Sequence, residues 1–395
     1  MKTCYEYLPL ELSYLVLLLG CGLAAILTIR PAKGNPVAHL HTILNPPGHT
    51  IEALLAARAS ANARLSRFLG LTNTFTDPSP TLHTAFRRTA RVLLARFTAR
   101  LPSFPSTSRT LLADLVECLP LELPFADFVQ LATFILVSTT LLGAHVPPAD
   151  WRAVLAVTHG INDLWTLSKR GCGPDAAARA QLAAVHAHLR RWLPEEHHAA
   201  PLDLVIPTYE TTWRVVAVLI ARGGGDGDTY AAPLRALFTA PTDRALCDAA
   251  AGVVREVLRL HPPVKRIARV GLTCRWLHSR TLPVFLRRLF SVTHIADVRA
   301  AHTSAVWGAS AADFDPGRFD HGRLTPAQRH AFASFGAGPL ACVAANDAPR
   351  IAGLIAGAVL ERITEGDVMV RRGEKIGDRR GWDGWSVKKG TCVRF

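Results

Sequence analysis

The spacing of hydrophobic and polar positions divides the chain into an apolar start, a long helical body and a short strand-bearing end. Leu10 to Ile29 are apolar apart from Glu11 and Ser13, and a helix needs about 20 such residues to cross a bilayer. From residue 51 to about 260, apolar positions recur every three or four residues, as in IEALLAARASANARLSRFL. Alternating strand-like stretches, ARVGLTCRW and GWSVKKGTCVRF, come only late. The pattern predicts a mainly α protein with small β-sheets, preceded by a single N-terminal transmembrane helix.

The predicted organisation is a membrane anchor over residues 1–30, a Pro/Gly hinge over 31–50 and one domain over 51–395. The hinge contains the helix-breaking Pro46, Pro47 and Gly48. A cleaved signal peptide is the alternative to the anchor, but its apolar core is usually shorter. Acidic residues precede the apolar run whereas Arg30 and Lys33 follow it, so the positive-inside rule places the remaining chain in the cytoplasm.

Composition and charge narrow the class of protein. Of the 395 residues, 49% are hydrophobic and 19% are charged, which is typical of a folded globular protein. The net charge of +14 favours acidic partners. The basic residues are dispersed and form no Lys/Arg-rich arm, so no nucleic acid partner is predicted. The eight cysteines contain no C-x-x-C pair, which argues against a disulfide framework and fits a reducing compartment.

Four stretches in the second half carry candidate chemistry. Each is ambiguous alone: E-x-x-R also describes a surface ion pair, and a lone cysteine is often an inert core residue. The first stretch interrupts an apolar helix with Pro207, which opens the backbone ladder locally. The stretches are LDLVIPTYETTWRVVAVLI (202–220), REVLRLHPPVKRIAR (255–269), ADFDPGRFD (312–320) and FASFGAGPLACVAA (332–345).

Taken in this order, the stretches resemble the cytochrome P450 family. Its markers are an acid-threonine motif, an E-x-x-R helix, an F-x-P-x-R-F loop and a cysteine loop with the frame F-x-x-G-x-x-x-C. The matching residues are Glu210 and Thr211; Glu256 and Arg259; Phe314, Pro316, Arg318 and Phe319; and Phe335, Gly338 and Cys342. The resemblance covers nearly the whole chain. Within the family, the chain is similar to membrane-anchored fungal members that act in secondary metabolism. It implies the cytochrome P450 fold with haem b, iron protoporphyrin IX, as cofactor.

The resemblance also implies a role for the matching residues in the last three stretches. Cys342 would be the metal ligand of the site, binding the haem iron as its axial thiolate. Thiolate ligation of haem iron favours O–O cleavage. Phe335 and Gly338 would shape the cofactor-binding loop around it. Glu256, Arg259 and Arg318 would form a buried ion-pair network whose role is structural, because it holds the scaffold of that loop.

Further roles follow for residues outside the cysteine loop. Thr211 and Glu210 would be the catalytic pair that delivers protons to iron-bound dioxygen. Arg269, with Arg266 as the fallback, would bind the haem propionates. His83 and Arg87 would reach the same propionates, although an ordinary basic helix face explains this last pair equally well.

The sequence departs from the family in both key segments. Leu340 stands where an arginine commonly pairs with a propionate, and Ala344 replaces the usual glycine. Pro207 and Thr208 occupy the positions where small residues usually precede the acid. The arginine matters most, because a charge-assisted hydrogen bond is among the stronger ones.

The function implied is a haem-thiolate monooxygenase, an oxidoreductase acting on a small apolar metabolite. It would use dioxygen and electrons from an NADPH-cytochrome P450 reductase. The resemblance places it in the endoplasmic reticulum membrane as a single-pass protein with a cytoplasmic catalytic domain. One alternative is a haem protein of the same fold that catalyses a non-oxidative rearrangement, dehydration or cyclisation. Another is a non-enzymatic haem carrier, against which substrate-induced spectral shifts would argue.

Overall fold

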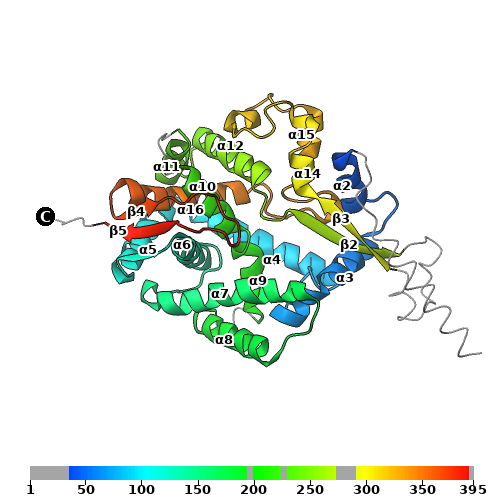
Figure 1. The fold of residues 1–395 in the computed structure, drawn as a ribbon, viewed down its shortest axis with the longest axis horizontal. Coiled ribbons are helices and arrows are strands. Elements are labelled where there is room, and N and C mark those ends of the chain that lie inside the picture. Colours follow the sequence, from blue (N-terminus) through cyan, green and yellow to red (C-terminus); the bar gives the residue numbers. More distant parts are fainter. Residues whose placement is uncertain (1–34, 194–198, 224–228, 273–290, 391–395) are drawn as a thin grey trace, which may run out of the picture.

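The computed structural model describes residues 35–193, 199–223, 229–272 and 291–390 (Figure 1). The predicted anchor, Leu10 to Ile29, lies outside the described residues. The described helices are α2 (Pro36–Leu44), α3 (Ile51–Leu69), α4 (Pro80–Ala99), α5 (Phe104–Cys118), α6 (Phe125–Thr140), α7 (Trp151–Leu167), α8 (Ala176–Trp192), α9 (Pro201–Tyr209), α10 (Thr212–Gly223), α11 (Ala231–Thr239), α12 (Arg244–Leu260), α14 (Val298–His302), α15 (Pro326–Ala331) and α16 (Ala348–Thr364).

Two small antiparallel sheets lie at opposite ends of the helical body (Figure 1). One has the strand order β1-β5-β4, in which Leu123 pairs with Val387 and Val370 pairs with Val387 from the other side. The other is the ribbon β2-β3, in which Arg269 pairs with His294. The strands are β1 (Glu122–Pro124), β2 (Arg266–Leu272), β3 (Ser291–Asp297), β4 (Val368–Arg371) and β5 (Ser386–Lys389). A mainly α fold with small sheets is therefore confirmed.

Several helices begin at residues whose side chains cap the backbone. The hydroxyls of Thr50 and Ser79 accept from the Ala53 and Leu82 amides at the starts of α3 and α4. Helix α15 has a capping box, in which Thr325 and Gln328 each bond the other's backbone N–H. These caps satisfy amides that the first helical turn leaves without partners.

Helices α9 and α10 run through the main core, where α10 packs against α6, α12 and α16. Pro207 lies inside α9, but the helix breaks later, between Tyr209 and Thr212. Proline has no N–H for the carbonyl four residues earlier. That carbonyl, on Asp203, accepts instead from the side chain of Asn73 at 3.0 Å. The loop before α4 therefore supports the opened segment of the helix.

A second hydrophobic cluster joins the start of the described chain to the segment before Cys342. Helix α2 packs against β3, and Leu40, Val298, Trp307 and Ala333 are buried in the same cluster. Helix α2 lies within the predicted hinge, so the chain between 36 and 44 is part of the packed body. The Pro-Pro-Gly turn follows it directly.

Among the residues that the structure describes, one helix is long and apolar enough to cross a membrane: 201–223, counted across α9 and α10. Of its apolar window, 72% is buried inside the protein. A buried core helix passes the same test, so this finding is weak support for a membrane span.

Candidate functional site

The Cys342 loop is shaped by backbone that only glycine adopts easily. Gly336 and Gly338 have φ values of +73° and +69°, in the left-handed region. A Cβ on Gly338 would also lie 2.8 Å from Asn45 Cβ, a distance too short for two carbons. The amide of Cys342 donates to the carbonyl of Phe335 at 2.8 Å and closes the loop. Phe335 itself packs against the main core.

The thiol of Cys342 is accessible although protein surrounds it. Its side chain is exposed, yet burial raises the pKa of the Cys342 thiol. Two smaller effects lower that pKa: a hydrogen bond from the backbone of Ala344 and the charge of Arg87. Cys342 is therefore an exposed residue whose thiol is partly desolvated by the protein around it. A hydrogen bond from an amide and a nearby positive charge stabilise a thiolate, the form that binds metal.

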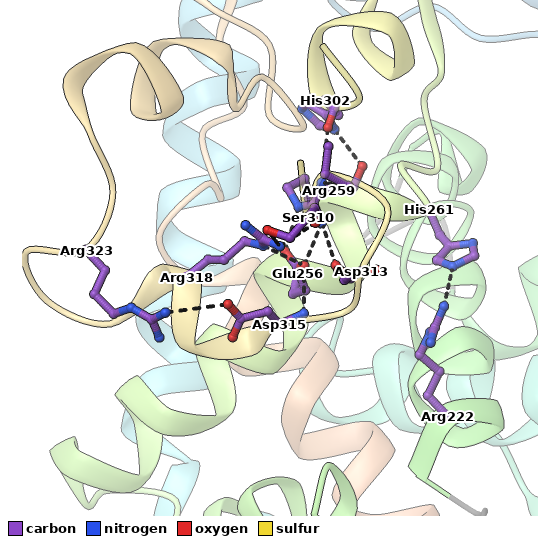
Figure 2. A network of polar contacts seen from close by, with 11 residues as sticks. Arg222, Glu256, Arg259, His261, His302, Ser310, Asp313, Asp315, Arg318 and Arg323 are labelled. Carbon is purple, nitrogen blue, oxygen red and sulfur yellow. Dashed lines mark hydrogen bonds and ion pairs between the residues drawn. The ribbon is translucent and has the colours of Figure 1, made fainter. Parts of the chain in front are cut away.

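Glu256 and Arg259 form a fully buried ion pair on α12, and each side chain is 0% exposed. Arg259 donates Nε to Oε2 and Nη2 to Oε1 of Glu256, both at 2.7 Å. Their spacing of three residues puts both on one helix face. Arg318, from the loop segment Pro316–Phe319, approaches Oε1 of Glu256 at 3.4 Å (Figure 2). The structure thus brings together the three residues predicted to form the network.

The network also holds the chain between α14 and Phe319. Arg259 Nη1 donates to the carbonyls of His302 at 3.2 Å and Ala311 at 2.6 Å. Arg259 Nη2 donates to the carbonyl of Asp313, and the amide of Asp315 donates to Glu256 at 2.9 Å. Figure 2 shows this loop wrapped around the two buried side chains. Few hydrogen-bonding sites on either charge are left unused, which is what burying an ion pair requires.

His302 links the network to the cysteine loop. It is fully buried, and burial lowers the pKa of His302 to about 4, so the ring is neutral at neutral pH. Nδ1 donates to the carbonyl of Arg259 at 3.0 Å, and Nε2 accepts from the amide of Ala333 at 3.0 Å. Because Nε2 must accept, these two bonds select a single tautomer. The ring fixes the end of α12 relative to the segment that leads to Cys342.

Arg87 on α4 contacts the same loop, and further basic residues that were predicted to bind the propionates lie on α4 and β2. Arg87 Nη1 reaches the carbonyl of Pro339 at 3.4 Å. His83 is buried and bonds Thr74 Oγ1 at 2.8 Å. Burial, then the charges of Arg58 and Arg87, lowers the pKa of His83. Arg269 lies on β2, where burial lowers its pKa to about 10, whereas the mostly exposed Arg266 pairs with Asp297 at 3.2 Å.

Glu210 lies at the break between α9 and α10, and its residue is 2% exposed. Its Oε1 accepts from Arg379 Nη2 and is 3.7 Å from Arg214 Nη1. Its Oε2 is buried without a hydrogen-bond partner. Burial raises the pKa of Glu210, and the guanidiniums of Arg379 and Arg214 oppose that rise. Beside it, Thr211 is partly exposed, and the carbonyl of Thr211 starts α10 by accepting from Val215.

Arg379 comes from the loop between β4 and β5, which carries an alternating set of charges. Arg379 Nη1 donates to Asn162 Oδ1 at 2.8 Å, and its guanidinium lies 4.9 Å from the Trp165 ring centre. The preceding residue, Asp378, accepts from Arg214 Nε at 2.6 Å and Lys265 Nζ at 2.5 Å. The last described loop of the chain is therefore tied to the central helix at its break.

Comparison with solved structures gives the fold a name. CYP175A1 from Thermus thermophilus aligns with a TM-score of 0.61 at 15% identity, over 90% of this chain and 88% of that one. CYP154A1 from Streptomyces coelicolor gives 0.56 at 19% identity, over 90% of each chain. The cytochrome P450 OleT bound to arachidonic acid gives 0.55 at 14% identity, over 84% and 83%. The chain has the cytochrome P450 fold.

Sequence comparison matches a much shorter part of the protein. No family model matches the chain. A stretch of 73 residues is 41% identical to benzoate 4-monooxygenase bphA from Aspergillus niger. It spans 17% of this chain and 14% of the length of that relative. The cytochrome P450 fold confirms the resemblance drawn from the motifs, whereas the activity of the relative is not carried over by so short a match.

The residues around Cys342 fit the haem that a cytochrome P450 fold implies. The accessible sulfur is a soft donor of the kind that binds iron. Arg269 Nε is buried without a partner, which leaves a donor free for an anionic group. The amide of Ala344 points at the sulfur although alanine replaces the usual glycine. The donor set is therefore consistent with an iron porphyrin bearing carboxylates.

Two important residues escaped the sequence motifs. His302 is preceded by the ordinary-looking run VRAA, and only its long-range bonds to Arg259 and Ala333 show its function. Arg379 is one of several arginines in a polar loop, and no periodicity distinguishes it. For His302, the only signal in the sequence is a histidine that follows a mostly apolar run. For Arg379, the sequence contains no comparable signal.

We expect Arg379→Gln to lower the free energy of unfolding by about 3 kcal/mol at neutral pH, because Glu210 would keep only Arg214 in a buried site. Losing Arg379 removes an effect that lowers the pKa of Glu210, so that pKa rises further. A carboxyl with a raised native pKa opposes folding only while ionised, so the deficit should shrink as pH falls through that pKa. Urea unfolding across the acidic range measures this.

Arg379→Lys keeps the charge and is the matched control, with a smaller deficit expected. A deficit of equal size at every pH would contradict the electrostatic explanation. It would assign the loss to the contacts of Arg379 with Asn162 and Trp165 instead.

Proposed function

We propose that this chain is a haem-thiolate monooxygenase that oxidises a small apolar metabolite, in fungal secondary metabolism. The single observation that carries the proposal is the position of Cys342. Its accessible thiol stands on a glycine-shaped loop, and the buried pair Glu256 and Arg259 supports the adjoining chain through His302. The cytochrome P450 fold around this arrangement supports the same conclusion.

Haem b supplies an iron centre that activates dioxygen when it is bound. In this proposal Cys342 Sγ binds the iron as a thiolate, and the Ala344 amide tunes the charge on sulfur. Phe335 and Gly338 hold the loop in shape. Arg269, His83 and Arg87 are proposed to bind the carboxylates of the porphyrin, and of these Arg87 contacts the cysteine loop.

Thr211 and Glu210 are proposed to hold and move protons at the break in the central helix. Oε2 of Glu210 is buried without a partner, so it can accept a proton without breaking a hydrogen bond. The raised pKa of Glu210 brings that transfer closer to neutral pH. Thr211 is the adjacent hydroxyl that passes the proton on.

Electrons are proposed to come from an NADPH-cytochrome P450 reductase. One face of helix α4 is basic and carries Arg87, Arg88 and Arg91. Arg87 from this helix also contacts the cysteine loop, so an acidic partner docked there would be near the sulfur. The proposed location is the endoplasmic reticulum membrane, with Leu10 to Ile29 as the single-pass anchor and the catalytic domain in the cytoplasm.

The test is product formation by the full chain with haem, reductase and NADPH under labelled dioxygen. We expect one labelled oxygen atom in the product and no turnover when any component is omitted. Benzoate, from the name of the Aspergillus relative, is a suitable first compound beside a panel of small apolar metabolites. Incorporation of oxygen from labelled water alone would contradict the proposal.

A redox-neutral rearrangement, dehydration or cyclisation is the second candidate function. The observation in its favour is Glu210, which two arginines hold in place, together with Pro207 and Thr208 at positions where the family usually has small residues. Turnover without NADPH or reductase would support this candidate. Strict dependence on both would exclude it.

A further inference from the structure

Two arginines, the buried Arg58 and the half-buried Arg269, lie on elements that pack against each other and are close enough to interact electrostatically. Arg58 on α3 is 6% exposed, and α3 packs against β2, which carries Arg269. Burial lowers the pKa of both guanidiniums to about 10, and the charge of Arg269 further lowers that of Arg58. Two neighbouring cations that are partly removed from water oppose folding unless an anion lies between them.

Neither arginine has a carboxylate partner among the described residues. Arg58 Nη2 donates to the carbonyl of Thr74 at 2.6 Å and to its hydroxyl. Arg269 Nη1 donates only to the carbonyl of its neighbour Ala268, at 2.9 Å. The Nε atoms of both arginines are buried without partners. The segment 273–290, which follows β2 in the sequence and lies outside the described residues, contains no Asp or Glu.

The pair connects to the cysteine loop through Thr74. The Thr74 hydroxyl bonds both Arg58 and His83, and His83 lies one helical turn before Arg87 on α4. Arg87 reaches Pro339 and influences Cys342. Helix α3 also contacts the turn Gly338–Leu340 directly. Arg58 therefore stands on the same side of the protein as the loop position that lacks its arginine.

We propose that Arg58 and Arg269 together form a carboxylate site for the haem propionates, in which Arg58 replaces the arginine that the loop lacks at Leu340. This rests on the proposed haem-thiolate function. Paired guanidiniums bind carboxylates through short, charge-assisted hydrogen bonds. The two Nε donors without partners and the mutual repulsion of the two guanidiniums both favour such a ligand. Helix α3 contacts both β2 and the turn Gly338–Leu340, so the helix that carries Arg58 also touches the cysteine loop.

The experiment compares haem with haem dimethyl ester, which has the same ring but no carboxylate charge. Full-length apoprotein is titrated with each, and binding is followed by the absorbance of the bound haem. We expect the wild type to favour the diacid by roughly tenfold to hundredfold. In Arg58→Gln the preference should fall to about threefold or less, since one of the two cations is gone. Arg58→Lys should restore part of it.

Arg64→Gln is the matched control on the same helix. Arg64 is also partly buried and basic, but it bonds Ser168 and lies against Trp165, so the preference should be unchanged. A second readout is the melting temperature of Arg269→Gln. Removing one of two like charges should leave the apoprotein as stable as the wild type or more so, while the haem-loaded form melts lower. If the role of Arg269 were purely structural, its replacement would lower the melting temperature of both the apoprotein and the haem-loaded form.

The outcomes separate this proposal from the function on which it rests. If the wild type binds haem with a thiolate signature and Arg58→Gln keeps the full preference for the diacid, only the present proposal fails. In another outcome, Arg58→Gln keeps the preference for the diacid, but its haem-loaded form binds a small aromatic carboxylate more weakly than the wild type does. The arginines would then bind the carboxylate of a substrate, and the present proposal would also be wrong. If the wild type binds no haem, both fail together.

Discussion

Cys342→Ala is expected to abolish the absorption band that carbon monoxide gives with a reduced, thiolate-ligated haem. Gly336 and Gly338 shape the loop that carries Cys342, and the backbone amide of Ala344 donates a hydrogen bond to its sulfur. Alanine removes the sulfur without adding bulk, so the loop can keep its shape. The measurement is the reduced carbon-monoxide difference spectrum of purified protein, and the expected change is complete loss of the band.

Cys247→Ala is the matched control. Cys247 is also a free cysteine, partly buried, and its thiol donates to the carbonyl of Pro241 at 3.6 Å. Its spectrum should equal that of the wild type. A Cys342→Ala protein that retained the band, or a wild type that lacked it, would show that another group binds the iron or that no haem-thiolate centre forms.

Glu256→Ala is expected to lower the free energy of unfolding by about 4 kcal/mol and to prevent accumulation of haem-loaded protein. The substitution leaves the fully buried Arg259 without its carboxylate, and it removes an acceptor of Arg318 and of the Asp315 amide. Removing one partner of a buried ion pair costs more stability than the whole pair contributes, because the remaining charge stays desolvated without a counterion. Denaturant unfolding and the ratio of haem to protein measure the two effects.

The control is an exposed ion pair of the same loop region. Asp320 lies 3.7 Å from Arg323, and both side chains are more than half exposed. Asp320→Ala should change stability by less than about 1 kcal/mol, as is usual for surface pairs. Equal effects of the two substitutions would mean that the buried network does not hold the loop, contrary to the contacts of Arg259 with Ala311 and Asp313.

Helix-forming segments and the local motifs were predictable from sequence because their physics is short-range. The three-residue spacing of Glu256 and Arg259 puts both on one face of a helix whatever the rest of the chain does. The strand prediction ARVGLTCRW corresponds to β2 over Arg266–Leu272, and its last residues fall outside the described part of the chain. The other, GWSVKKGTCVRF, contains β5.

Predictions about long helices were less accurate where tertiary contacts compete with local preference. Pro207 was expected to interrupt the helix, but the backbone continues to Tyr209 because Asn73 takes the carbonyl that proline leaves unpaired. The hinge was expected to extend over 31–50. Residues 36–44 instead form α2, since burial of Leu40 against the β3 cluster compensates for the neighbouring prolines.

By itself, the sequence determined the candidate residues and the order in which they occur, because glycine turns, helix spacing and a single cysteine in its frame act within a few residues. Only the tertiary structure decided their partners. Arg379 meets Glu210 across 169 residues, His302 joins Arg259 to Ala333, and the packing of α3 on β2 brings the charge of Arg269 close enough to affect Arg58. Such pairs leave no periodic trace, because they depend on how buried charges find compensation once the helices have packed.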